Sequence, residues 1–384
     1  MDTGRLAPYH ADHMTTGSGF EIFLATLPGL EATLQAEAGG KGFRRVRAVP
    51  GGVTIEGGWP EVWRANLWLR CAGAVLARIA SFHASHLAEL DRRARLVPWA
   101  ELLRPDIPFR VEASCAGSRI YHSDAAAERI ATAIHATLGA PESPDAEVVI
   151  RARLERDTCT ISLDTSGEPL HRRGHKQAVN LAPLRETMAS AFLFECGYAG
   201  TEPLVDPMCG SGTFVIEAAE IAARLNPGRT RRFAFEHLAT FDSEAWARMR
   251  AVASRREPPA ICHGADRDAG AIAMSLANAE RAGVTEGTRF HQAPISALEP
   301  PPGPPGLVIV NPPYGARMGD AARLATLYQA LGHRLRSRFG GWRVGLVTAN
   351  TRLAQATGLP FLPPGPPVPH GGMRVRLFRT AGLG

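Results

Sequence analysis

The feature that most constrains the fold is a regular alternation of strand-like and helix-like segments after Gly167. Apolar runs suited to strands occupy residues 202–206, 260–266, 306–311 and 342–349, and helical periodicity follows three of them at 213–225, 269–282 and 321–338. Such a β–α–β rhythm is typical of a mostly parallel sheet covered by helices. The sequence therefore predicts an α/β domain in the second half of the chain, with a last strand at 373–378.

The first half of the chain has a different pattern, that of small α+β units. Strands are predicted at 21–25, 51–55, 75–82 and 109–113, helices at 30–38, 59–69 and 123–138, and a β-hairpin at 148–154 and 159–163. Ser123 is placed to cap the third of these helices. Residues 1–17 are predicted to be a disordered tail, and the Pro-rich stretch 363–369 to be irregular.

Composition places the chain among ordinary globular proteins. It is 384 residues long, 45% hydrophobic and 21% charged, with a net charge of +6 that permits an anionic partner such as nucleic acid without requiring one. No run approaches the ~18 apolar residues of a membrane span, and the N-terminus lacks a secretion signal. The 6 cysteines contain no C-x-x-C pair, which argues against a zinc or disulfide framework. These features predict a cytoplasmic protein without metal or membrane association.

The first candidate site follows the strand-like run 202–206. A glycine-rich turn there opens the next helix, and its predicted ligand-binding residues are Asp206, Met208, Cys209, Gly210, Ser211, Gly212 and Thr213. Glycines let the backbone approach a ligand closely, and the helix N-terminus offers unpaired N–H groups. The turn is neither G-x-G-x-x-G nor a P-loop. An acidic residue before it suits a ligand with a cationic amine beside a carboxylate, and S-adenosylmethionine carries both.

Two further motifs end the next strand-like runs. Asp266, followed by Arg267, can accept both ribose hydroxyls of a nucleoside cofactor, although a lone Asp at a strand end is more often a helix cap. The predicted catalytic residues are Asn311, Pro312, Pro313 and Tyr314. The Asn311 side-chain oxygen and the Pro312 carbonyl can accept both hydrogens of an aromatic amine and align its nitrogen with a sulfonium methyl, and Tyr314 offers a stacking face. Because all three motifs end successive strands, we predict one site.

With these motifs the chain resembles the THUMP-domain class I RNA methyltransferases, specifically the family that methylates guanine N2 in large-subunit (23S) ribosomal RNA. The matching segments are 27–31 and 51–53 in the family's ferredoxin-like start, 109–138 in its THUMP segment, and 164–168, 170–174 and 182–187 at its domain junction. The junction is the most specific signal, because Asn-Pro-Pro-Tyr is shared with DNA adenine and protein-glutamine methyltransferases.

The resemblance implies a fold, a cofactor and a partner. The fold is a Rossmann-like class I methyltransferase domain (169–384) preceded by a ferredoxin-like domain (18–70) and a THUMP RNA-binding domain (71–168). The cofactor is S-adenosyl-L-methionine, and the partner is structured RNA, 23S rRNA or a precursor particle. The family usually places an acidic residue against adenine after the third strand, but this chain has none between His291 and Ser296. We expect the backbone N–H of Ile295, or Ser296, to replace it.

Basic residues supply the predicted RNA contacts. Arg172, Arg173 and Lys176 lie between the predicted RNA-binding and catalytic domains, and that position favours phosphate contact over a solvated surface loop. Arg119 lies in the THUMP-like segment. Cys209 suggests the thiol nucleophile of a pyrimidine C5 methyltransferase, but such enzymes need a cysteine beside the substrate, so we interpret Cys209 as a small loop residue.

The sequence therefore predicts methyl transfer to guanine N2 of RNA without a metal or a covalent intermediate. Two alternatives stay open. A THUMP-bearing transfer-RNA guanine methyltransferase has a similar layout. A non-catalytic RNA-binding ribosome-assembly factor would retain the fold, and the missing third-strand carboxylate favours it, whereas the intact run at Asn311–Tyr314 argues against it.

Overall fold

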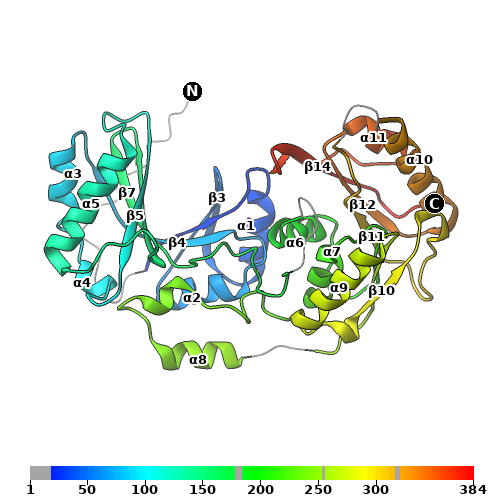
Figure 1. Cartoon of the computed structure of the whole chain (residues 1–384), viewed down its shortest axis with the longest axis horizontal. Coiled ribbons are helices and arrows are strands. Elements are labelled where there is room, and N and C mark those ends of the chain that lie inside the picture. The colour runs from blue at the N-terminus through cyan, green and yellow to red at the C-terminus, as the bar shows by residue number, and fades with distance from the viewer. Residues whose placement is uncertain (1–18, 178–183, 253–255, 316–320) are drawn as a thin grey trace.

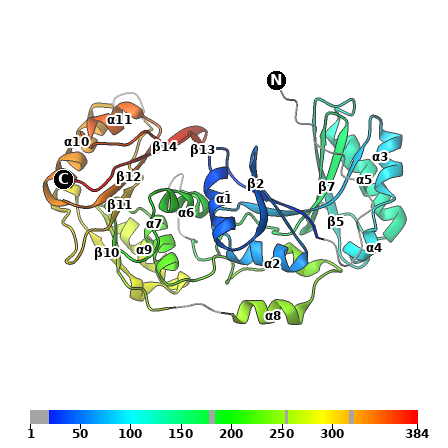
Figure 2. The ribbon, with the colours of Figure 1, turned by 180° about the vertical axis from the view of Figure 1, so that it is seen from behind.

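The computed structural model describes residues 19–177, 184–252, 256–315 and 321–384. The predicted tail at 1–17 and residues 182–183 of the junction run lie outside these ranges. Two seven-stranded sheets follow one another along the long axis of the molecule (Figures 1 and 2). Among the described helices, none is long and apolar enough to cross a membrane.

The N-terminal sheet has the strand order β2-β3-β1-β4-β7-β6-β5. Its strands are β1 (Phe20–Ala25), β2 (Arg44–Val49), β3 (Gly52–Gly57), β4 (Ala74–His83), β5 (Phe109–Ala116), β6 (Val148–Glu155) and β7 (Thr158–Asp164). Its helices are α1 (Glu31–Gly40), α2 (Trp59–Trp68), α3 (Leu87–Ala94), α4 (Trp99–Leu102) and α5 (Ser123–Leu138). All neighbours pair antiparallel except β5 and β6, which are parallel.

Strand β4 joins the two predicted N-terminal domains into one sheet. Its first residues, from Ala74 to Ala77, pair with β1, and its residues from Leu76 to His83 pair with β7. Buried residues of β4 such as Val75 and Ala77 lie in a core that continues through both halves of the sheet. The two halves are therefore connected by backbone hydrogen bonds and not only by a linker.

The C-terminal sheet has the order β10-β9-β8-β11-β12-β14-β13. Its strands are β8 (Leu204–Asp206), β9 (Cys262–Asp266), β10 (Thr288–Gln292), β11 (Leu307–Val310), β12 (Arg343–Thr348), β13 (Val368–His370) and β14 (Met373–Arg379). Its helices are α6 (Glu186–Glu195), α7 (Thr213–Ala222), α8 (Ser243–Ala251), α9 (Ala269–Ala282), α10 (Ala321–Arg338) and α11 (Thr351–Ala356), with a short 3₁₀ turn η3 (Ile295–Ala297).

The first five strands of this order are parallel, and β14 runs antiparallel to β12. Successive strands proceed outward from β8 to β10, and the chain then returns to place β11 on the other side of β8. In open α/β sheets ligands bind at the carboxyl ends of the strands on either side of such a reversal. A ligand is therefore expected to bind the residues that follow β8 and β11.

Two local predictions were wrong. The residue preceding α5 is His122, and no side chain caps the helix there, so Ser123 is its first residue and not its cap. The stretch 363–369 is not wholly irregular, because Val368 begins β13 and pairs with Val375 of β14. Pairing with a neighbouring strand, which composition does not show, orders this Pro-rich segment.

Candidate active site

The turn between β8 and α7 has a backbone that only glycine accommodates easily. Gly210 and Gly212 have φ values of +54° and +86°, a region that side chains disfavour. A Cβ on Gly212 would also lie only 3.0 Å from the Ser275 hydroxyl oxygen. Ser211 is buried and Thr213 is the first residue of α7. The turn is thus tightly packed against α9, which fixes the direction of its N–H groups.

Asp266 brings the first two motifs together. Its Oδ2 accepts a hydrogen bond from the Gly210 N–H at 3.0 Å, and its Oδ1 accepts one from the Asp268 N–H at 3.0 Å. The Cys209 N–H donates to the Ala265 carbonyl at 3.0 Å. Asp268 has a different role: it caps α9, because its side chain accepts a hydrogen bond from the Gly270 N–H at 2.9 Å. Asp266 therefore both shapes the turn and retains carboxylate lone pairs for a ligand.

Asp206 is a buried carboxyl at the end of β8, and it is 2% exposed. Burial raises its pKa to about 8, and the nearby Asp266 carboxylate adds to this, while the Met208 N–H bound to Oδ1 at 3.1 Å opposes it. A cationic partner is the group that best stabilises the ionised form of such a buried carboxyl. The position fits the ammonium group of an amino-acid-like ligand.

The remaining residues predicted to bind the cofactor differ in exposure. Met208 is half-buried against the core around β11, and the Arg267 side chain is exposed while its carbonyl accepts from the Gln292 amide at 3.0 Å. Ile295 is half-buried and begins η3, so its N–H and that of Ser296 precede the first bond of the helical turn. Burial raises the pKa of the Cys209 thiol, which disfavours the thiolate that a nucleophile requires.

Asn311 follows β11, whose four residues are all buried. Its Oδ1 is buried and has no hydrogen-bond partner among the described residues. Leaving such an acceptor unpaired costs about 1–3 kcal/mol, so this oxygen is suited to a donor from a ligand. Because Leu307 and Val308 pair with Leu204 and Val205, Asn311 lies at the same edge of the sheet as Asp206.

The rest of this motif is held by one buried tyrosine, Tyr328 of α10. The Tyr328 hydroxyl donates to the Pro313 carbonyl at 3.3 Å and lies 3.2 Å from the Thr348 hydroxyl. Pro312 is buried, and Tyr314 is half-buried between the two hydrophobic cores. Burial raises the pKa of Tyr314 to about 12, so its ring is a neutral, partly accessible face. Tyr328 therefore anchors the Pro313 end of the motif next to β12.

The four residues predicted to bind RNA fall into an exposed pair and a buried pair. The side chains of Arg119 and Arg172 are 77% and 62% exposed, and they pair with Asp157 and Glu168 respectively. Arg173 and Lys176, in contrast, have side chains that are only 2% and 9% exposed. The prediction of phosphate contact is wrong for these two residues, because their charged groups are turned into the protein.

Arg173 belongs to a buried ionic cluster, the junction cluster, formed by Arg70, Arg173, Glu217 and Glu220. Arg70 Nη1 lies 3.0 Å from Glu217 and 3.1 Å from Glu220, and Arg173 Nε lies 3.3 Å from Glu217. Burial alone would raise the pKa of Glu217, but Arg173 and Arg70 outweigh it and lower this pKa to about 2. The cluster joins the segment between α2 and β4 to α7, the helix that begins at the glycine-rich turn. One signal of it was visible in the sequence: two glutamates three residues apart interrupt an otherwise apolar helix.

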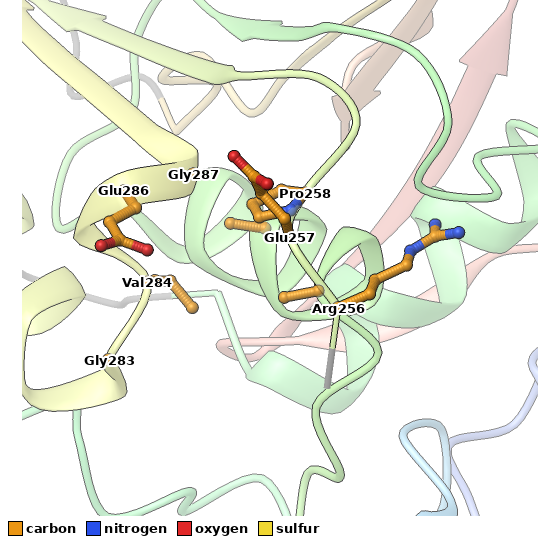
Figure 3. A pocket seen from close by; sticks show the side chains of 9 residues that line it. Arg256, Glu257, Pro258, Gly283, Val284, Glu286 and Gly287 are labelled. Atoms are coloured by element: carbon orange, nitrogen blue, oxygen red, sulfur yellow. The ribbon is translucent and has the colours of Figure 1, made fainter. Parts of the chain in front are cut away.

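Two cavities lie away from these motifs. One of about 310 Å³ is lined by residues that precede β9 and β10, including Arg256, Glu257 and Glu286, at the amino edge of the sheet (Figure 3). Another of about 590 Å³ lies beside β2 and β3. Among the described residues, no group of three His, Cys, Asp or Glu side chains is arranged to hold a metal. The candidate site is therefore defined by the loops after β8, β9 and β11.

The fold and these loops define a class I methyltransferase domain that follows an α+β N-terminal region. Family models match residues 21–76 as an RlmL ferredoxin-like domain, 84–164 as a THUMP domain and 173–360 as an RMKL-like methyltransferase domain. The chain thus has the domain order of the RlmL-like THUMP methyltransferases, with a ferredoxin-like domain, a THUMP domain and a methyltransferase domain.

Relatives and solved structures agree with this assignment. The ribosomal RNA large subunit methyltransferase K/L of Syntrophotalea carbinolica is 36% identical over 359 residues, which are 88% of this chain and 50% of that protein. The chain thus spans about half the length of the curated relatives it matches. The methyltransferase SMU.472, solved with SAH, has a TM-score of 0.87 at 26% identity and covers 96% of this chain and 100% of its own. A Listeria monocytogenes structure described as a predicted N6-adenine-specific DNA methylase has a TM-score of 0.87 at 28% identity, covering 95% and 96%.

Proposed function

We propose that this chain transfers a methyl group from S-adenosylmethionine to the exocyclic N2 of guanine in RNA, with large-subunit (23S) ribosomal RNA as the substrate. The observation that carries the proposal is the buried, unpartnered Asn311 Oδ1 at the same sheet edge as Asp206 and the turn tied to Asp266. An RNA substrate is supported by the THUMP match at 84–164 and by the relatives named as ribosomal RNA methyltransferases. The structural neighbour from Listeria, by contrast, is described as a methylase of adenine in DNA, which does not support an RNA substrate.

The residues present fit the cofactor. When bound, S-adenosylmethionine supplies an electrophilic methyl group on its sulfonium. The Asp206 carboxylate would hold the ammonium group, and the free lone pairs of Asp266 would accept the ribose hydroxyls. The N–H groups of Ile295 and Ser296 would face the adenine in place of the acidic residue that this chain lacks.

Asn311 and Pro312 would act on the acceptor amine. A guanine amine is a poor nucleophile because its lone pair is delocalised into the ring. Two acceptors, the Asn311 Oδ1 and the Pro312 carbonyl, would bind its two hydrogens, return electron density to the nitrogen and fix its direction of approach. Tyr314 would stack on the base, which must leave its helix to reach this loop. As the new N–C bond forms, the bond between the methyl carbon and the sulfonium sulfur would break and leave a neutral thioether, and the nitrogen would lose one proton to water.

We further propose a division of labour along the chain. Residues 18–70 and 71–168 would hold structured RNA by shape and phosphate contact, with Arg119 and Arg172 among the contacts, and residues 169–384 would carry the chemistry. We also propose that the protein acts in the cytoplasm, where its RNA substrate would be.

Nucleoside analysis tests the proposal. The purified chain is incubated with methyl-labelled S-adenosylmethionine and, separately, with protein-free 23S rRNA, a large-subunit precursor particle and total tRNA, and the RNA is then digested. N2-methylguanosine in ribosomal RNA supports the proposal. The same nucleoside in tRNA alone would shift the substrate to tRNA. N6-methyladenosine, or cofactor binding without transfer to any RNA, would overturn it.

A further inference from the structure

Two buried polar side chains of α9 face the glycine-rich turn between β8 and α7. Ser275 and Asn278 are both 0% exposed and lie three residues apart, so they share one face of the helix. Helices α7 and α9 lie side by side (Figures 1 and 2). A buried polar group costs free energy unless it forms a hydrogen bond. These two side chains therefore require partners inside the protein, and the turn provides them.

Both side chains bind carbonyl groups of the turn. The Ser275 hydroxyl donates to the Gly210 carbonyl at 2.8 Å, and the Asn278 Nδ2 donates to the Ser211 carbonyl at 3.0 Å. The peptide bonds of the turn are trans, and in a trans peptide the N–H of the next residue points opposite to the carbonyl. Because the Gly210 carbonyl points at α9, the Ser211 N–H points away from this helix. The direction of the peptide groups in the turn thus depends on α9 as well as on the glycines.

Arg281 fixes which way the Asn278 amide faces. Its Nη2 donates to the Asn278 Oδ1, so the amide nitrogen is the group that faces the Ser211 carbonyl. The Arg281 Nε donates to the His175 carbonyl at 2.7 Å, in the segment between β7 and α6 that joins the N-terminal region to the catalytic domain. Arg281 therefore anchors the Asn278 amide on that segment.

We propose that Ser275 and Asn278 are positioning residues for S-adenosylmethionine, which act through the glycine-rich turn. They hold the turn so that the Ser211 N–H faces the carboxylate of the cofactor, whose ammonium group binds Asp206. The inference rests on the proposed function, because it requires the cofactor to lie against this turn. An N–H group that already points at its acceptor loses little conformational freedom on binding, so its orientation affects affinity. Neither side chain touches the cofactor or the RNA.

Three variants of the full-length chain test these roles. Ser275→Ala removes one donor to the turn, and Asn278→Asp removes the other while it keeps an acceptor for Arg281. Thr288→Val is the matched control, because it also deletes a buried hydroxyl that donates to a backbone carbonyl, that of Val284 at 3.1 Å, but at the amino end of β10. Calorimetry measures the affinity for S-adenosylhomocysteine at a temperature at which circular dichroism shows each variant to be folded. Steady-state kinetics measure kcat and the KM for S-adenosylmethionine.

Ser275→Ala and Asn278→Asp should each raise the dissociation constant for S-adenosylhomocysteine about tenfold, the loss expected when one hydrogen bond that orients a binding group is removed. The KM for S-adenosylmethionine should rise by the same factor, and kcat at saturating cofactor should stay unchanged, which is the pattern of lost uniform binding. A purely structural defect would instead lower kcat through the fraction of folded enzyme. Thr288→Val should bind the cofactor as tightly as wild type.

Wild-type affinity in Ser275→Ala or in Asn278→Asp would overturn the role of that residue. An equal loss of affinity in Thr288→Val would overturn both roles, because any lost buried hydroxyl would then weaken binding. The two variants remove different donors, so if one does not fold, the other still decides the proposal. Calorimetry needs no RNA, so a wild-type chain that binds S-adenosylhomocysteine but methylates no guanine would contradict the proposed function while the roles of Ser275 and Asn278 are still decided.

Discussion

Asn311 combines two properties that rarely occur together in a folded protein, a buried acceptor atom and the lack of a donor for it among the described residues. Replacement by Ala removes the acceptor and leaves Pro312 and the neighbouring backbone in place. Loss of one preorganised contact of this kind should slow methyl transfer by about a hundredfold or more. Single-turnover kinetics with labelled cofactor measure this loss.

Two controls accompany the Asn311→Ala experiment. RNA affinity and cofactor affinity should both stay near the wild-type values, because neither depends on the amide oxygen until the base is in place. A variant with turnover within about threefold of wild type would contradict the role given to Asn311, since one lost transition-state contact is worth far more.

Asp266 and Asp268 form a matched pair of carboxylates two residues apart. Asp266→Ala removes the proposed acceptor for the ribose and releases the Gly210 N–H, so S-adenosylmethionine should bind about ten- to a hundredfold more weakly. Asp268→Ala removes only the cap of α9, which should cost about 1 kcal/mol of unfolding free energy and leave cofactor affinity unchanged. Calorimetry measures the affinity of both variants for S-adenosylmethionine. Equal losses of affinity would contradict the role of Asp266 as the ribose acceptor.

The pKa of Asp206 predicts a pH dependence. Burial raises it from 3.8 to about 8, so the folded state favours the protonated carboxyl, and its contribution to stability is lost as pH rises from the unfolded value through about 8. An ammonium ligand favours the ionised carboxylate, so cofactor affinity should rise over the same pH range. Asp206→Asn should bind the cofactor more weakly and with little pH dependence. Identical pH profiles for the two proteins would refute this assignment.

At the residue scale, the sequence predicted features that the local residues determine by themselves, such as the glycine turn. It failed where the position of a charged side chain depends on residues far away in the sequence. Gly210 and Gly212 require φ values that their sequence context already suggests. Arg172 and Arg173 are adjacent and identical in type, yet one is exposed and the other buried. Only the folded chain brings Glu217 to Arg173, so the local sequence could not separate the two arginines.

At the scale of elements, this pair of arginines makes the buried junction cluster testable. Arg173→Ala leaves Glu217 partly unpaired in the interior and should lower the unfolding free energy by about 3–5 kcal/mol. Arg172→Ala should change stability by less than about 0.5 kcal/mol but should lower the salt slope of RNA binding by about 0.7 if Arg172 contacts a phosphate. Denaturant unfolding and an RNA salt series separate the two effects, and a reversed pattern would contradict the structure.

Elements with a clear pattern were predicted from sequence, and elements ordered by their neighbours were missed. The apolar periodicity of α5 and the continuous apolar run of β11 indicate a helix and a buried strand directly. β2 reads Arg-Arg-Val-Arg-Ala-Val and is mostly exposed, so only its pairing with β3 makes it a strand. α6 is buried along most of its length and therefore shows no amphipathic period.

At the scale of the whole molecule, packed contacts connect the ferredoxin-like and THUMP region to the candidate active site. β4 unites the two halves of the N-terminal sheet, the junction cluster ties the segment before β4 to α7, and the β13–β14 hairpin contacts the loop at Gly29. The distance from the THUMP region to Asn311 is thus set by the fold. Such an arrangement suits selection of one nucleotide at a defined distance from a structured RNA element.

The most direct test of the central claim maps N2-methylguanosine in the ribosomal and transfer RNA of a strain that lacks this chain. The account predicts that N2-methylguanosine is lost at one or more positions of the large-subunit RNA, that the wild-type chain restores it and that Asn311→Ala does not. Full modification of the large-subunit RNA in the deletion strain, or restoration by Asn311→Ala, would contradict it.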